Sequence, residues 1–445
     1  MKNYSKILLA MAFAMSLFTT LSAKTIYVTT TGSNTNTGLS WASPKQSIAQ
    51  AMLIAVEGDD VWVKAGIYTQ AAGGISVSLK SISIYGGFAG TEIALADRNW
   101  VTNKTILNNT GTATNSRHFL VGSTGDATNF ILDGFTLQNG TSNAGGAISF
   151  SGSLSQNMIV RNCIFRNNRS TGNNGTISLL AGNSVSFYNC LFENNEAADK
   201  ASVVGNLGTC NFYNCTFVNN KSARTVDGAG TVMFLGSSGS LVNCIVWNNR
   251  NSFDNSLSSI GGLPNPAINV HHVASDLSFT GALNTIVLNQ TNDNAVGPNF
   301  KNVGASVGYV ADVTTLDALD YSLSDNSTCV NAGIDSEVQN NVDLAKQSRI
   351  FGGRVDLGCY ENQQMQYSGL NNLIDKNTLW VSVLNKKITV HGLSEKTKVE
   401  LISLEGRVIL IKTIEVNGTI DIPASGIYIL NVNKEPIKQS IKIII

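Results

Sequence analysis

The chain has 445 residues, enough for two or three domains or for one long solenoid with an appendage. Lys and Arg number 30, as do Asp and Glu, so the formal net charge is zero and only 13% of the residues are charged. Nucleic-acid grooves and anionic membrane patches need clustered cations, so this balance excludes nucleic acid as an expected partner.

The first 23 residues have the features of a secretory signal peptide. Lys2 and Lys6 precede an apolar stretch from Ile7 to Phe18, and residues that are small except for Leu21 follow up to Ala23. The apolar stretch is shorter than the roughly 20 residues of a membrane-spanning helix. No later segment is apolar enough to span a bilayer, so we predict export and no transmembrane span in the mature chain.

The mature chain opens with elements suited to the capped end of a repeat protein. Residues 25–28 predict a strand, and residues 43–52 predict a short helix with Ser43 as its N-cap. Asp59 and Asp60 could be a carboxylate pair for chemistry. They follow Gly58 and precede a strand, which is typical of a solvated turn, and we favour the turn.

A motif then repeats four times, at residues 162–168, 189–195, 214–220 and 243–249. Its Cys residues are 27, 25 and 29 positions apart, and this variable period with Asn-rich turns fits a solenoid with one coil per repeat. The positions that define the repeat are Asn162, Asn189, Asn214 and Asn243, then Cys163, Cys190, Cys215 and Cys244, then Phe165, Phe192 and Phe217.

The apolar spacing within a repeat predicts the path of one coil. Val160 and Cys163 are three residues apart, so both can face inward only if the chain bends at Asn162. Asn tolerates the left-handed conformation of such a bend better than other non-glycine residues. We expect the bend asparagines of successive coils to stack about 4.8 Å apart, each side-chain amide bonding the next.

A third strand follows a polar loop in each repeat, at residues 146–150, 175–179 and 230–234. The predicted fold class of residues 24–295 is therefore all-β, a right-handed parallel β-helix with three strands per coil and an N-terminal cap. The repeated Cys would form an inward stack of free thiols. Parallel neighbours hold their Cβ atoms about 4.8 Å apart, beyond the reach of a disulfide.

The repeat resembles known β-helix families. Phe165-x-x-Asn168 and Gly145-Gly146-Ala147-Ile148 are similar to the repeats of chlamydial polymorphic outer-membrane proteins and, more broadly, of the pectin-lyase-like superfamily. The opening coils around residues 84–100 look like those of secreted Bacteroidetes β-helix proteins. These motifs follow from β-helix physics, so they support the fold much more than a shared function.

Residues 296–362 resemble the choice-of-anchor Q region, which implies the last coils of a β-helix in a surface protein. The resemblance rests on residues 320–323, 329–333 and 353–361. Cys329 and Cys359 could pair as a clamp, and this is left open. Arg354, Asp356 and Glu361 are interpreted as the polar framework of these coils.

Residues 363–378 are a polar linker, and residues 379–445 alternate apolar and polar positions in short runs that predict a small β-sandwich of about seven strands. The pieces that carry Gly406, Arg407, Gly426 and Tyr428 resemble the type IX secretion C-terminal sorting domain. That resemblance implies the type IX secretion machinery as a partner, and a secreted or outer-membrane cell-surface location in a Gram-negative bacterium. The linker lacks a Pro-Asn-Pro-like opening, and an ordinary Ig-like accessory domain is the alternative.

The sequence offers no convincing catalytic, metal or cofactor residues. Enzymes on this fold place charged residues on an outward strand face, and the third strand should turn only Ala147, Ser149, Thr176, Ser178, Thr231 and Met233 outward. His271 and His272 with Asp276 form the only ligand-like cluster. Adjacent residues of a strand point to opposite faces, which weakens it.

Two functions remain. The first is an adhesive or binding scaffold whose Ser/Thr/Asn faces meet a glycan, a host protein or a neighbouring cell. The alternative is a polysaccharide lyase or glycoside hydrolase with a loop-borne site, for example within residues 250–295. We predict the scaffold.

Overall fold

The structure is a computed structural model that divides into two compact units, residues 1–365 and 366–445. It describes residues 23–445 except 70–71, 79–80, 110–114, 123–128, 152–156, 200, 207, 224–231, 235–237, 253–255, 258–259, 262–267, 279–281, 289–293, 296, 365–379, 385–386, 392, 394, 404–405, 417, 423–426, 435–436 and 445. The predicted signal peptide therefore lies outside the described residues except for Ala23, and so does nearly all of the predicted linker.

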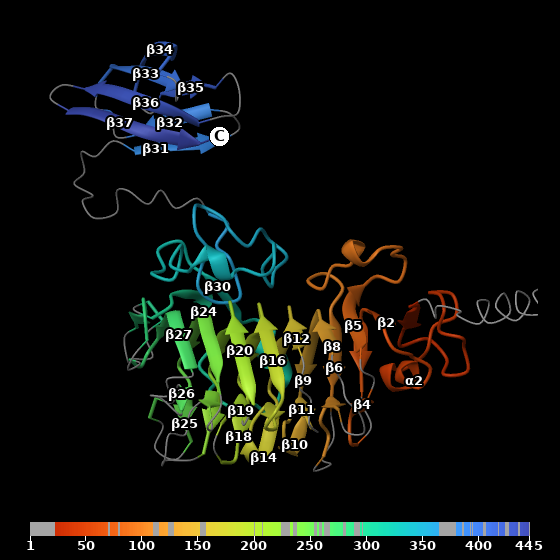
Figure 1. The fold of residues 1–445 in the computed structure, drawn as a ribbon. Helices are drawn as coiled ribbons and strands as arrows, with labels where there is room; N and C mark the ends of the chain where they lie inside the picture. Colours follow the sequence, from red (N-terminus) through yellow and green to blue (C-terminus); the bar gives the residue numbers. More distant parts are fainter. Residues whose placement is uncertain are drawn as a thin grey trace, which may run out of the picture. The chain divides into compact units, whose positions relative to one another are not determined.

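The first unit is a parallel β-helix whose coils stack side by side (Figure 1). One stack of strands, each paired in parallel with the next, comprises β1 (Thr25–Val28), β2 (Asp60–Lys64), β5 (Ser81–Phe88), β8 (Asn129–Asp133), β12 (Asn157–Arg161), β16 (Ser184–Tyr188), β20 (Thr209–Tyr213), β24 (Gly239–Trp247) and β27 (Ile268–Ser275). β28 (Ile286–Val287) pairs with β27 and is the last strand added to this sheet.

Two further stacks complete each coil. The second comprises β3 (Gly66–Tyr68), β6 (Thr105–Asn108), β9 (Phe135–Gln138), β13 (Ile164–Arg166), β17 (Leu191–Glu193), β21 (Thr216–Val218) and the end of β24. The third comprises β4 (Ile75–Val77), β7 (Phe119–Val121), β11 (Ile148–Phe150), β15 (Ile177–Leu179), β19 (Val204–Asn206), β23 (Val232–Phe234) and β26 (Ile260–Gly261). The predicted three strands per coil are confirmed.

The structure adds a fourth short strand where the sequence predicted a polar loop. These strands are β10 (Thr141–Ala144), β14 (Arg169–Asn174), β18 (Glu196–Ala197), β22 (Lys221–Ser222) and β25 (Arg250–Asn251). They pair in parallel with one another as a separate sheet. The prediction failed because these segments are polar and short, and they become strands only by pairing with the coil above and below.

The bends between strands lie at asparagines. Asn162, Asn189, Asn214 and Asn243, the first Asn row, have φ angles of 53°, 50°, 52° and 55°. A second Asn row bends the chain again five residues later: Asn167, Asn194, Asn219 and Asn248 have φ angles of 56°, 51°, 55° and 52°. The three-residue strands β13, β17 and β21 are thus held between two left-handed bends in every coil.

Stacked aromatic rings fill the interior of the solenoid. Phe192 lies between Phe165 and Phe217, with ring centroids 4.8 and 5.0 Å away and the planes within 7° of parallel. Phe187 stacks on Phe212 at 5.0 Å in the same core. These side chains are fully buried, so each contributes a large apolar area to the core.

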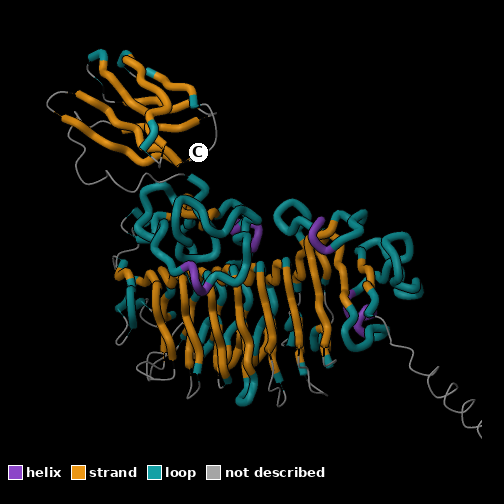
Figure 2. The backbone as a smooth tube through the Cα atoms, turned by 45° about the horizontal axis from the view of Figure 1, so that its top comes forward, coloured by secondary structure: helices purple, strands orange, loops and turns teal. Residues whose placement is uncertain are grey.

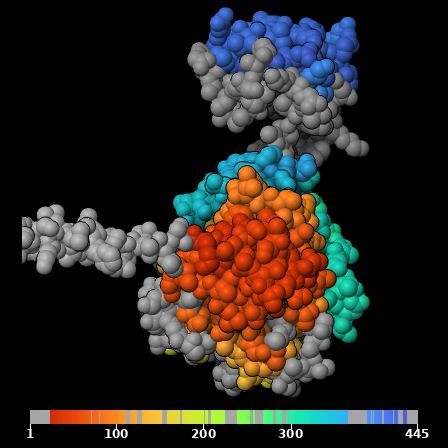
Figure 3. Space-filling view, turned by 90° about the vertical axis from the view of Figure 1, so that its right-hand side faces the viewer, coloured from red at the N-terminus to blue at the C-terminus, as the bar shows by residue number. Residues whose placement is uncertain are grey.

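The N-terminal end of the solenoid is covered by its first elements (Figure 3). The helix α2 spans Ile48–Met52, and Ser47 caps it by accepting a hydrogen bond from the Gln50 N–H. The prediction of a helix from residue 43 with Ser43 as N-cap was wrong. The backbone N–H of Lys45 donates to the Tyr27 carbonyl, which holds residues 43–46 against β1 instead.

Residues 296–362, named the cover here, do not form further coils, so that prediction was wrong. Their strands β29 (Phe300–Asn302) and β30 (Asp320–Leu323) pair antiparallel, away from the parallel stacks. The rest is mainly loops, which gather along one side of the strands (Figure 2). The cover reaches back to an early coil, since Trp100 Nε1 donates to the Leu344 carbonyl at 2.9 Å.

The second unit is a small two-sheet β-structure. One sheet comprises β31 (Trp380–Leu384), β32 (Lys387–His391) and β35 (Thr419–Asp421), and the other β34 (Val408–Ile414), β33 (Thr397–Ser403), β36 (Ile427–Lys434) and β37 (Ile437–Ile444). Ile388 and Ile420 of one sheet share a buried core with Leu401 and Leu430 of the other. Across the described residues of the chain, no helix is both long and apolar enough to cross a membrane.

Candidate binding face

Both Asn rows hold the cover against the solenoid. From the first row, Nδ2 of Asn189, Asn214 and Asn243 donates to the carbonyls of Val342 (2.7 Å), Asp356 (3.4 Å) and Ile334 (3.0 Å). From the second row, Nδ2 of Asn167, Asn194 and Asn219 donates to the carbonyls of Val310 (2.9 Å), Ser306 (2.8 Å) and Val303 (3.2 Å). The cover therefore lies over the strands between the rows, β13, β17 and β21.

The predicted amide ladder forms on other asparagines. In the first row, only Asn189 donates from Nδ2 to its neighbour's side chain, Asn162 Oδ1, at 3.3 Å. The continuous ladder lies on Asn168, Asn195, Asn220 and Asn249, with Nδ2-to-Oδ1 distances of 3.1, 2.9 and 2.9 Å. The first-row amides bond mainly to the cover because its carbonyls compete for them. The ladder amides are fully buried in the solenoid and therefore bond to one another.

The repeated cysteines point inward as free thiols. Cys163, Cys190, Cys215 and Cys244 are buried and unpaired. Burial raises the pKa of the Cys163 thiol to about 12, so it stays protonated and behaves as a small apolar side chain.

Cys329 and Cys359 do not form the disulfide that was left open. Both are buried free thiols in the apolar layer between the cover and the solenoid. The Leu357 N–H donates to the Cys329 carbonyl, so Leu357 is the residue paired with Cys329. The Cys359 N–H donates to Thr216 Oγ1 of the solenoid at 3.0 Å, which fixes Cys359 on β21.

The residues of the sorting-motif resemblance are spread over the second unit. Gly406 has a φ of 81° in an exposed turn between β33 and β34, and Arg407 next to it is exposed. Tyr428 lies in β36 and is 8% exposed. Gly426 lies outside the described residues.

The strands under the cover have an apolar outer face. Leu191, Val218, Ile245 and Trp247 are buried there against cover residues such as Phe300. Glu193 is buried in the same layer, and burial raises its pKa to about 7, an effect that the neighbouring Arg166 only partly offsets. Its Oε2 has no hydrogen-bond partner among the described residues. This acid is enclosed between the solenoid and the cover.

The outer face of β16, β20 and the start of β24 is not under the cover's apolar layer. Its outward residues alternate with buried ones and are half-buried, apart from Val242, which is buried. They are Ser184, Ser186 and Tyr188, then Thr209, Asn211 and Tyr213, then Ser238, Ser240 and Val242. This set, named the tyrosine face here, is uncharged and rich in hydroxyl groups.

The tyrosine face is ordered by stacking between coils. The rings of Tyr188 and Tyr213 stack with centroids 5.1 Å apart and planes at 12°. Thr209 and Ser238 hydroxyls lie 2.9 Å apart, and Asn211 Nδ2 donates to Ser186 Oγ at 3.4 Å. Burial raises the pKa of both tyrosine hydroxyls, so both remain protonated at neutral pH and can donate hydrogen bonds.

A charged cluster borders the tyrosine face. Arg161 is paired in register with Tyr188 on one side and Asp133 on the other. Asp133 Oδ2 lies 2.6 Å from both Arg161 Nε and Arg98 Nη2, and its Oδ1 accepts from Asn162 at 2.9 Å. Because Asp133 is fully buried and paired on both oxygens, it orients Arg161 at the edge of the face.

The third-strand residues that were predicted to turn outward are not exposed to solvent where the structure describes them. Ala147 and Thr176 are fully buried, and Ser149 and Ser178 are 6% and 2% exposed. The unpredicted strand β14 contacts β19 beside this face. Thr231, and the side chain of Met233, lie outside the described residues.

The two histidines do not point to opposite faces. His272 continues the first Asn row with a φ of 52°, and this bend brings its Nδ1 to 3.1 Å from His271 Nδ1. Asp276 is separate: its Oδ2 accepts from the Asn248 N–H at 2.7 Å. Among the described residues, no three His, Cys, Asp or Glu side chains form a group that could hold a metal ion.

The architecture places the first unit in the class of right-handed parallel β-helices. A family model described as "Right handed beta helix region" matches residues 122–281. Among solved structures, the chain is similar to "Crystal structure of pectate lyase Pel9A", with 14% identity, a TM-score of 0.42, and coverage of 77% of this chain and 97% of that one. It is also similar to "Rhamnogalacturonan lyase", with 15% identity, a TM-score of 0.33, and coverage of 57% and 68%. No curated protein matches.

Proposed function

We propose that this chain is an exported scaffold, secreted or held at the outer-membrane surface, whose tyrosine face binds a glycan. The observation that carries the proposal is the ordered, uncharged array of tyrosine, serine, threonine and asparagine side chains on β16, β20 and β24. Tyrosine provides rigid contact area with one polar end, and Ser and Asn provide adaptable hydrogen bonds, a combination typical of binding surfaces.

The proposed route to the surface rests on the two ends of the chain. Residues 1–23 have the charge and apolar pattern of a signal peptide, and residues 379–445 resemble a type IX sorting domain. Deleting residues 379–445 should abolish surface exposure of the protein in a host that has this secretion machinery, measured by protease accessibility on intact cells. Unchanged surface exposure would contradict the sorting role.

Glycan binding is tested on the secreted full chain with a glycan array. The double variant Tyr188→Ala/Tyr213→Ala should lose at least about tenfold in affinity for the bound glycans, because truncating a central tyrosine of a binding surface costs about 1–2 kcal/mol or more. Tyr309→Ala is the matched control, since Tyr309 is an exposed tyrosine of the cover. Equal binding by all three proteins would contradict the proposal.

The alternative, a polysaccharide lyase or glycoside hydrolase with a loop-borne site, is tested on the same protein. Release of reducing ends or unsaturated products from uronic-acid polymers or neutral polysaccharides would replace the scaffold with an enzyme.

A further inference from the structure

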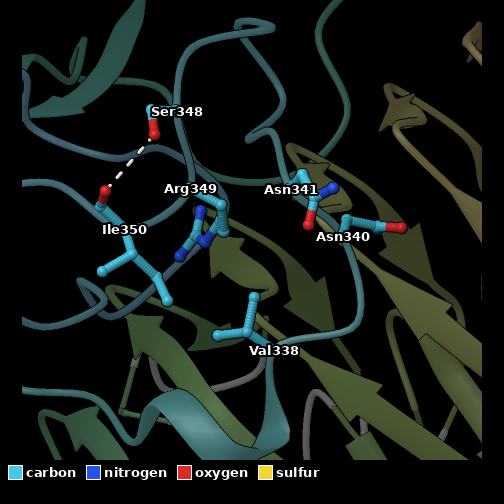
Figure 4. A pocket seen from close by; sticks show the side chains of 6 residues that line it. All are labelled: Val338, Asn340, Asn341, Ser348, Arg349 and Ile350. Atoms are coloured by element: carbon cyan, nitrogen blue, oxygen red, sulfur yellow. Dashed lines mark hydrogen bonds between the residues drawn. The ribbon is translucent and has the colours of Figure 1, made fainter.

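A cavity of about 280 Å³ lies in the cover (Figure 4). Its lining residues are Val338, Asn340, Asn341, Ser348, Arg349 and Ile350. The Asn340 side chain is directed away from the other lining residues, and Ser348 Oγ donates to the Ile350 carbonyl at 3.3 Å (Figure 4). Arg349 is 1% exposed and donates to two backbone carbonyls. These polar groups are turned away, bonded or buried beyond the reach of a ligand, so the cavity does not indicate a binding site.

Exposed apolar residues are concentrated instead on one strand of the second unit, β34 (Figure 1). The structure describes fourteen exposed large apolar side chains, and four of them, Val408, Ile409, Ile411 and Val416, lie on this strand or just after it. Ile411 is 53% exposed. Single apolar residues are ordinary on a protein surface, whereas a group of them on one strand indicates contact with another chain.

The strand β34 is also an edge strand. It is the last strand of the sheet β34-β33-β36-β37, and among the described strands it pairs only with β33. Its pairing with β33 skips Ile409, which forms a bulge, and is regular over residues 410–414. The free edge of a strand presents backbone N–H and C=O groups that can pair with a strand of another chain.

The outer face of the sheet beside this edge is apolar as well. Val408 is paired in register with Ile402, and Ile402 with Ile429, and both isoleucines are half-buried. Ile402 and Glu400 are two residues apart on β33, so Ile411, which is paired with Glu400, lies on the same face. A strand added at the edge would therefore cover apolar side chains in addition to pairing its backbone.

We propose that β34 is a self-association surface, where a second copy of this chain adds its own β34 in antiparallel orientation. The two four-stranded sheets then form one continuous sheet across a two-fold axis at Ile411. Arg407 and Glu415 are exposed and lie four residues on either side of Ile411. Antiparallel pairing therefore brings Arg407 of one copy to Glu415 of the other, at both ends of the contact.

The charges on the strand select this register. Pairing centred on Lys412 would place Lys412 opposite itself, and like charges directly opposite are destabilising. Pairing centred on Ile411 places Lys412 opposite Leu410, and Ile411 opposite Ile411. Lys412 Nζ also donates to the Thr419 carbonyl of its own unit at 3.1 Å.

This complementarity of the strand to itself is the reason for assigning a second copy as the partner. Glu415 lies 2.8 Å from Lys396 Nζ, but the two side chains are 72% and 70% exposed, so Glu415 remains accessible to a partner. The contact involves one strand from each copy, and so small an interface should give a weak dimer that forms as concentration rises. The dimer does not depend on glycan binding by the tyrosine face.

The test is sedimentation velocity of the full chain over a range of micromolar concentrations. The wild type should change from monomer to dimer, and Ile411→Asp should weaken dimerisation at least about tenfold because it places two carboxylates opposite each other. Ile67→Asp is the matched control and should dimerise like the wild type, since Ile67 is 61% exposed on β3, the last strand of its stack in the first unit. A wild type that stays monomeric, or equal effects of the two substitutions, would overturn the proposal.

Exchange of the two charges tests the antiparallel register. Arg407→Glu and Glu415→Arg should each weaken the dimer about threefold or more, and the double variant Arg407→Glu/Glu415→Arg should restore it because opposite charges meet again. Both positions are exposed, so each variant should melt like the wild type. Weakening without recovery in the double variant would overturn this register.

Cross-linking tests the contact directly. Opposite residues of an antiparallel pair hold their Cα atoms about 4.5–5.5 Å apart, within the range of a disulfide. Ile411→Cys should therefore give a covalent dimer on oxidation with diamide, seen on a non-reducing gel, because the natural cysteines are buried and should not react in the folded protein. Ile67→Cys is the control, and equal cross-linking by the two variants would overturn pairing through β34.

Discussion

Two sets of asparagines in the same repeat, the first Asn row and the ladder, have different roles. Asn162 and Asn168 are six residues apart, and each recurs in the next three coils. The ladder asparagines bond one another inside the solenoid, whereas the first row bends the chain and donates mainly to the cover. The residue type is the same, so the difference comes from the backbone conformation and from what lies within reach of the amide.

The largest expected effect is on the ladder. In Asn220, Nδ2 donates to Phe192 O and Asn249 Oδ1, and Oδ1 accepts from the N–H and Nδ2 of Asn195. Asn220→Ala should lower the free energy of unfolding by about 4 kcal/mol or more, since several buried groups lose partners at about 1–3 kcal/mol each. Chemical denaturation measures it.

The matched variant for this comparison is Asn214→Gly in the first row. Glycine keeps the positive φ of 52°, and only a 3.4 Å bond to the cover is lost, so we expect a change below about 1 kcal/mol. Equal losses of unfolding free energy in Asn220→Ala and Asn214→Gly would contradict the distinction between the ladder and the first Asn row.

The covered and uncovered faces should also respond differently. Trp247 is 1% exposed beneath the cover, with its ring centroid 6.2 Å from that of Phe300. Trp247→Ala should cost about 3–5 kcal/mol and speed hydrogen exchange in the cover. Tyr213→Ala, on the tyrosine face, should cost about 1 kcal/mol or less. A similar cost for both variants would show that the tyrosine face is also a packed interface.

A smaller, pH-dependent effect is expected from the acid under the cover. Burial raises the pKa of Glu193 from its ordinary value of 4.5 to about 7, so the folded state binds this proton more tightly than the unfolded state. The contribution of Glu193 to stability is therefore greatest below pH 4.5 and falls as the pH rises through about 7.

Glu193→Gln should remove that slope and be more stable than the wild type at pH 8, by on the order of 1–3 kcal/mol relative to the difference at pH 4.5. Denaturant midpoints at the two pH values measure it. Glu395→Gln, at an exposed position of the second unit, should leave the slope unchanged. If the wild type gains stability relative to Glu193→Gln between pH 4.5 and pH 8, the raised pKa of Glu193 is contradicted.

The smallest expected effect is on the reactivity of the cysteine thiols in the native protein. All seven cysteines are buried, so a thiol reagent should label none of them in the native protein and seven after unfolding without reductant. Five labelled thiols after unfolding would indicate that one pair, with Cys329 and Cys359 the first candidates, is oxidised.

The sequence by itself determined the coil path of the solenoid. The spacing of Val160, Asn162, Cys163 and Phe165 requires a bend at the asparagine, and the structure has a left-handed φ there. This could be read locally because inward and outward positions of a strand alternate and because few residue types adopt that conformation.

Only the tertiary structure decided which outer surfaces are free. Ile164, Leu191 and Ile245 are outward apolar residues next to the repeated cysteines, and this signal could have predicted a covering layer. The residues before the bends, Tyr188 and Tyr213, carried the corresponding signal for the uncovered face. What lies over each face is set by contacts between residues more than 100 positions apart, such as Asn194 with Ser306, and no local pattern encodes such pairs.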